Sequence, residues 1–116
     1  MSVVVTLASL MIQAAPVAGQ GSGLVSYEES VRCAGLTQAA SELEGGESAR
    51  GRRLYDAALF WSLAAMQAGT ASGKSPSAAE ADQTRARIAA VRQLNADAPS
   101  AEAALTRCLQ KTPDLN

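Results

Sequence analysis

The segment from Leu54 to Met66 limits the possible folds more than any other part of the chain. It contains three of the four aromatic residues, and Asp56 is its one charged side chain. At helical spacing its apolar residues cover two faces: Leu54, Ala58, Trp61 and Ala65 on the first, and Tyr55, Leu59 and Met66 on the second. A helix that is apolar nearly all round is surrounded by other elements. We therefore predict that this segment is the central helix, on which the other helices pack.

The composition favours an all-α fold in a single domain. Of the 116 residues, 47% are hydrophobic but only 3% are aromatic, so leucine, valine and abundant alanine must build the core. Alanine has the highest helix propensity and lets helices pack closely. Neither strand alternation nor an internal repeat is present in the sequence. We expect a small four-helix up-down bundle over residues 26–112, followed by a tail over 113–116.

Capping signals place the four helices. Ser26-Tyr-Glu-Glu29 fits a capping box, and Gly45-Gly46 ends the first helix. Gly69 is expected to end the second helix, and Pro76 and Pro99 suit the first positions of the third and fourth. These signals predict helices over about 27–44, 48–68, 76–95 and 99–112. The expected buried faces are Ala81, Thr84, Ile88, Val91 and Asn95 in the third helix, and Ala101, Ala104, Leu105 and Cys108 in the fourth.

The N-terminal residues have the character of a signal peptide. Val3–Ile12 is mostly apolar, and no charged side chain precedes Glu28. This run is too short to span a bilayer as a helix, but it suits the hydrophobic region of a signal peptide. We expect residues 1–19 to be a signal peptide cleaved after Gly19, and residues 20–25 to be a flexible linker. The alternatives are an uncleaved anchor and a buried N-terminal helix.

The two cysteines, Cys33 and Cys108, are expected to form a disulfide. They stand 75 positions apart, and no CxxC motif or histidine accompanies them, so a zinc site is unsupported. Export to an oxidising compartment favours one structural disulfide. In an up-down bundle the two positions lie at the same end, which makes the bond geometrically reasonable. Two buried free thiols are the alternative.

Arg50, Arg52 and Arg53 form a basic cluster at the start of the second predicted helix. Arginines in a first turn oppose the helix dipole, so the cluster is a candidate contact for an anion or an acidic partner. The plainer interpretation is a solvated face. The acidic residues that would neutralise it are Glu42, Glu44, Glu47 and Asp56.

Aromatic and methionine side chains of the second predicted helix are candidate lining for an apolar ligand pocket: Tyr55, Phe60, Trp61 and Met66. Bundle interiors host such sites. The plainer interpretation is that these residues are ordinary core. In either case a buried Trp61 needs a hydrogen-bond partner for its indole N–H.

The sequence favours a binding protein over an enzyme. Histidine is absent, which removes the commonest general base and metal ligand, and we expect no cofactor or metal. The net charge of −1 gives no indication of a nucleic-acid partner. We expect an exported bacterial protein, periplasmic or secreted, without a membrane span after cleavage. It would bind another envelope protein as a small chaperone, inhibitor or accessory subunit. The alternative is a carrier of a small apolar ligand in the bundle core. The specific partner and the oligomeric state stay open.

Overall fold

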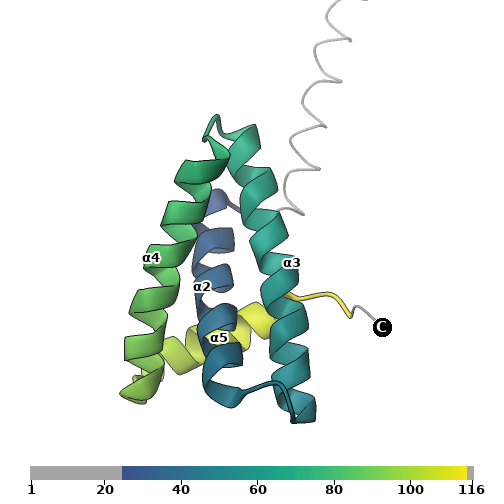
Figure 1. Cartoon of the computed structure of the whole chain (residues 1–116), viewed down its shortest axis with the longest axis vertical. Helices are drawn as coiled ribbons and strands as arrows, with labels where there is room; N and C mark the ends of the chain where they lie inside the picture. Colours follow the sequence, from purple (N-terminus) through teal and green to yellow (C-terminus); the bar gives the residue numbers. More distant parts are fainter. Residues whose placement is uncertain (1–24, 115–116) are drawn as a thin grey trace, which may run out of the picture.

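The computed structural model describes residues 25–114, and this part of the chain is all-helical (Figure 1). The helices are α2 (Tyr27–Glu44), α3 (Ala49–Ala71), α4 (Pro76–Asn95) and α5 (Pro99–Lys111). The predicted all-α fold with four helices is therefore confirmed for the described range. The predicted signal peptide over 1–19 lies outside it, as do most of the linker and the last two residues of the tail. No helix within residues 25–114 is long and apolar enough to cross a membrane.

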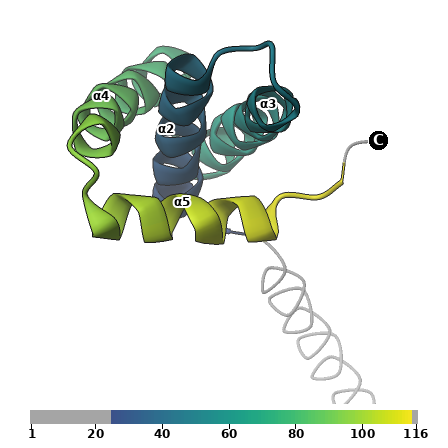
Figure 2. The same cartoon turned by 90° about the horizontal axis from the view of Figure 1, so that it is seen from below.

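Helices α2, α3 and α4 run alternately up and down, but α5 does not continue this pattern. It lies across α2 at a steep angle (Figures 1 and 2). The short connection over 96–98 turns the chain, and Asp97 adopts a left-handed conformation there with φ of 55°. Asp is one of the few residues that tolerate this conformation. The predicted buried face of α5 is confirmed, because Ala101, Ala104, Leu105 and Cys108 are all buried.

The central helix is α2, and the prediction that the aromatic helix takes this place is wrong. α2 lies between α3 and α4 and is crossed by α5 (Figure 2). Every residue from Cys33 to Thr37 is buried. These residues are mostly small, which lets three neighbours approach: a Cβ added to Gly35 would stand 2.6 Å from the Ala86 Cβ. Small volume, rather than apolar character, decides which helix is surrounded.

Helix α3 is buried on one face only. The first predicted face is confirmed, since Leu54, Ala58, Trp61 and Ala65 are buried. The second is not buried: Tyr55 and Leu59 are exposed, as is Leu63 beside them. The helix ends at Ala71, beyond the predicted stop at Gly69, because Gly69 serves packing instead. A Cβ there would lie 3.1 Å from the Tyr27 ring.

Serine side chains cap three of the helices. Ser26 accepts a hydrogen bond from the Glu29 backbone N–H, which confirms half of the predicted capping box. Ser48 and Ser75 accept from Gly51 and Ala78 in the same way. These local bonds satisfy amide groups that lack a partner within the helix. They fix where α2, α3 and α4 begin.

Candidate functional site

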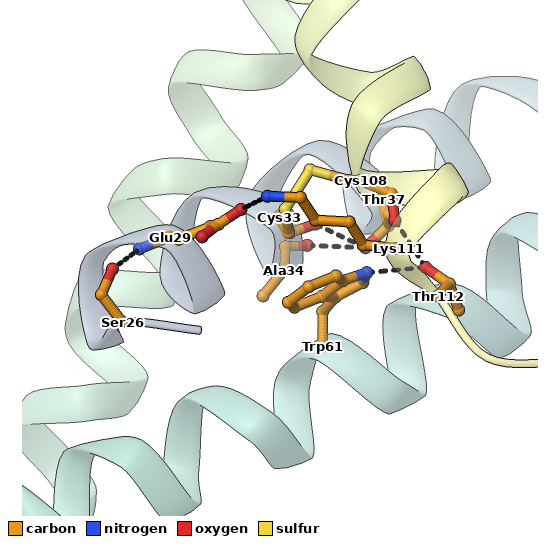
Figure 3. Close-up of a disulfide and its surroundings, with 9 residues drawn as sticks. All are labelled: Ser26, Glu29, Cys33, Ala34, Thr37, Trp61, Cys108, Lys111 and Thr112. Carbon is orange, nitrogen blue, oxygen red and sulfur yellow. Dashed lines mark hydrogen bonds and ion pairs between the residues drawn. A yellow bond between two sulfur atoms is a disulfide. The ribbon is translucent and has the colours of Figure 1, made fainter. Parts of the chain in front are cut away.

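A disulfide joins the central helix to the crossing helix. The cysteine pair predicted from the sequence, Cys33 and Cys108, is bonded, with Cα atoms 5.5 Å apart. Both cysteines are buried within the core cluster. The bond ties α2 to α5 across a loop of 75 residues (Figure 3).

Trp61 lies beneath this disulfide and links α3 to the end of α5. Its indole is 1% exposed, and its Nε1 donates to Thr112 Oγ1 at 2.8 Å. Thr112 in turn donates to the Cys108 carbonyl oxygen at 2.7 Å (Figure 3). An ion pair between Lys111 and Glu29 gives a further link between α5 and α2. The hydrogen-bond partner expected for Trp61 is thus Thr112, and this junction serves to hold the fold.

A second cluster lies at the first turn of α2. The Tyr27 hydroxyl donates to Asp82 Oδ2 at 2.7 Å, and the Lys74 ammonium lies 5.1 Å from the centroid of the Tyr27 ring. Asp82 also pairs with Arg85, and with Lys74 at 3.8 Å. Burial and the bond to Asp82 raise the pKa of Tyr27 to about 12. The same hydrogen bond, with the nearby cations, lowers the pKa of Asp82. The cluster joins α2 to α4 and to the loop before α4.

The structure does not bring the four candidate pocket residues together. Trp61 is in the core, and Phe60 stacks edge-on against it with ring centroids 5.0 Å apart. Tyr55 is 56% exposed and lies beside a groove between α3 and α2. Met66 is half-buried and accepts a hydrogen bond from Gln83 Nε2 at 3.3 Å. Side chains that point in such different directions do not line one cavity.

The arginine cluster is solvent-exposed and largely balanced. Arg50 pairs with Glu44 at 3.6 Å. Arg52 donates to the backbone carbonyl of Glu47 at 3.1 Å. Arg50 and Arg53 border a groove of about 430 Å³ between α3 and the end of α5, which Asp56 and Asp114 also line. Carboxylates share this groove with the arginines. The cluster is therefore better described as a solvated, charge-balanced surface than as a binding site for an anion.

The exposed apolar residues of α3 form the feature that sequence reasoning missed. Tyr55, Leu59 and Leu63 stand at i, i+4 and i+8, with exposed fractions of 56%, 48% and 64%. We call these three residues the α3 apolar face. Such spacing places them on neighbouring turns along one side of the helix. The spacing of Tyr55 and Leu59 is visible in the sequence, but apolar spacing alone does not distinguish a buried face from an exposed one.

Polar groups border this face. A groove of about 300 Å³ runs beside Tyr55 and Leu59, where α3 meets α2 and α4. Within it Gln38 Nε2 donates to Ser62 Oγ at 2.6 Å, and Arg87 pairs with Glu42 at 3.3 Å. An apolar centre with a polar rim is the arrangement found in protein–protein interfaces.

Comparisons with known proteins found no relative of this chain. No protein family, no curated protein and no solved structure matches this chain.

Proposed function

We propose that this chain is an exported, non-enzymatic protein that binds another protein of the cell envelope through the α3 apolar face. One observation carries the proposal: three large apolar side chains, each about half exposed or more, stand on neighbouring turns of one well-formed helix. Single exposed leucines are ordinary in soluble proteins, but a row of them indicates an interaction site.

The shape of this face favours a protein over a small molecule. Sites for small ligands are concave and enclose most of the ligand surface. The α3 apolar face instead runs along one side of a helix, which an apolar groove on a partner can accept. Helix-in-groove recognition uses apolar anchors along one side of a helix, commonly at i, i+3, i+4 and i+7, and the spacing of i, i+4 and i+8 in the α3 apolar face is similar. A small chaperone, an inhibitor or an accessory subunit would each use such a face.

Export is supported by the disulfide and by the N-terminal sequence. Disulfides persist in the periplasm and outside the cell, and are rare in the cytosol. The Cys33–Cys108 bond is fully buried beside Trp61, as expected of a structural bond. A disulfide-bonded domain without a membrane-spanning helix in residues 25–114 is compatible with export. The apolar run Val3–Ile12 is the expected signal for it.

Site-specific photocrosslinking in cells tests the proposal. A photoreactive amino acid at Leu63 should give a discrete crosslinked band with an envelope protein. The matched control carries it at Ile88, an exposed apolar residue of α4 outside the α3 apolar face. Leu59→Glu in the Leu63-labelled protein should abolish the band. Equal crosslinking from Leu63 and Ile88, or a band that survives Leu59→Glu, would contradict the proposal.

A further inference from the structure

A further groove lies away from the α3 apolar face and is lined by residues of α2, α4 and α5. These three helices meet where α5 leaves α4 and crosses α2 (Figures 1 and 2). It has a volume of about 550 Å³. Its apolar lining consists mainly of small side chains from all three helices: Val31, Ala86, Ala89, Ala101 and Ala104. The volume falls within the range of about 300–1,000 Å³ that is typical of small-molecule sites.

Two arginines from different helices border this groove. Arg32 of α2 and Arg107 of α5 line it, and both also line the smaller neighbouring groove that reaches the disulfide. Arg32 and Arg107 are thus the two cationic residues shared by the adjoining grooves. Within residues 25–114, neither arginine forms an ion pair or a side-chain hydrogen bond.

The nearby carboxylates do not balance this charge. Asp82 is bound by Tyr27, Lys74 and Arg85, and Glu29 is bound by Lys111. Glu28 is the remaining acidic side chain that lines the two grooves. Two guanidinium groups thus face one carboxylate, and the local charge is complementary to an anion.

The disulfide holds the two arginines near each other. Arg32 directly precedes Cys33 and Arg107 directly precedes Cys108, so the bond with its Cα–Cα distance of 5.5 Å fixes both backbones. Two like charges that line one groove repel each other, and a bound anion relieves the repulsion. Because the backbone positions are fixed in advance, only the two arginine side chains need to become ordered when a ligand binds.

We propose that this groove binds a long-chain carboxylate, such as a fatty acid. The carboxylate lies between Arg32 and Arg107, since guanidinium groups bind carboxylates through paired hydrogen bonds. The alkyl chain lies along the alanines, whose small side chains form a smooth floor suited to an unbranched chain. The site is separate from the α3 apolar face and does not depend on the protein-binding function.

Calorimetric titration of the oxidised full chain with decanoate tests the site. We expect one decanoate per chain. Arg32→Gln with Arg107→Gln should weaken binding at least tenfold. The matched control, Arg52→Gln with Arg92→Gln, removes the same charge from exposed arginines outside the groove and should bind as the wild type does. Ala89→Leu fills the groove and should weaken binding while leaving both arginines in place.

Two further ligands test the contributions of the carboxylate group and of the alkyl chain separately. Decanol, which lacks the charge, and acetate, which lacks the chain, should each bind at least tenfold more weakly than decanoate. Reducing the disulfide should also weaken decanoate binding, because the arginines are then no longer fixed. The proposal is overturned if the wild type does not bind decanoate. It is equally overturned if the Arg32/Arg107 variant binds as tightly as the wild type, if the control variant loses as much, or if decanol binds equally well. Circular dichroism of each variant establishes that it is folded.

Discussion

Trp61 of α3 and Thr112, the residue that follows α5, are joined by a hydrogen bond of 2.8 Å beneath the disulfide. Trp61 is the largest of the fully buried side chains in the described range. Because the indole is buried, its N–H needs an acceptor within the protein, and Thr112 provides it. The bond also fixes the end of the crossing helix on α3. Three helices, α2, α3 and α5, are therefore held at one point.

We predict that Thr112→Val destabilises the protein by about 1–3 kcal/mol, because it leaves the buried indole N–H without an acceptor. Urea denaturation followed by Trp61 fluorescence measures the effect. Thr106→Val is the matched control. Thr106 makes the same kind of bond to its own helix, to the Glu102 carbonyl, but has no tryptophan partner and is exposed. Equal losses in the two variants would show that the Trp61 bond contributes nothing.

Removal of the disulfide should have a larger effect. The Cys33–Cys108 bond closes a long loop, and the chain-entropy model gives it about 4–5 kcal/mol. For a domain of this size, Cys33→Ser with Cys108→Ser should lower the melting temperature on the order of 20 °C. Thermal unfolding followed by circular dichroism tests this, with the reduced wild-type protein as a comparison. An unchanged transition would mean that packing alone holds α5 in place.

The Tyr27–Asp82 bond predicts a loss of stability at high pH. The pKa of Tyr27 is about 12 in the folded protein and ordinarily 10.0. Its contribution is therefore fully present below pH 10 and is lost as the pH rises from 10 to 12, because the unfolded chain releases the proton first. A shift of this size corresponds to roughly 2–3 kcal/mol.

Denaturant unfolding at pH 9 and pH 11 measures this loss. Tyr27→Phe should reduce the difference between the two pH values, whereas Tyr55→Phe, at an exposed position of α3, should leave it unchanged. If the stability of Tyr27→Phe depends on pH as that of the wild type does, groups other than Tyr27 cause the loss of stability at high pH. At low pH the stability changes in the opposite direction, falling as the pH falls. The lowered pKa of Asp82 means that its contribution is present above its ordinary pKa and is lost as the pH falls.

Local signals and the cysteine pair could be predicted from the sequence. Ser26, Pro76 and Pro99 mark helix starts through contacts within a few residues, so no tertiary information is needed. The Cys33–Cys108 pairing follows because the chain has only two cysteines. The partners of Tyr27 could not be predicted, because Asp82 is 55 positions away and charged residues at many other positions would serve as well.

Packing faces were predicted less well where small residues form the contacts. In α4 the expected face contained Ile88 and Thr84, yet both are exposed. The buried residues are Ala79, Gln83, Ala90 and Leu94. Hydrophobic periodicity gives little weight to alanine and none to glutamine, although both pack well where helices lie close together. The same bias placed α3 at the centre and concealed the α3 apolar face and the groove lined by alanines.

The central position of α2 leads to a final prediction at Gly35. Replacement of a helical glycine by alanine ordinarily stabilises a helix by about 1 kcal/mol. At Gly35 the added methyl group would lie 2.6 Å from both the carbonyl carbon and the Cβ of Ala86, so α2 and α4 must move apart. Overpacking of this kind costs about 1–3 kcal/mol, which exceeds the gain in helix propensity.

Gly35→Ala should therefore be destabilising in urea denaturation. Gly46→Ala is the control, because nothing lies within 4 Å of its added Cβ and its change should be close to neutral. A stabilised Gly35→Ala variant would mean that α2 and α4 are not in close contact there, and that α2 is not the helix around which the others pack.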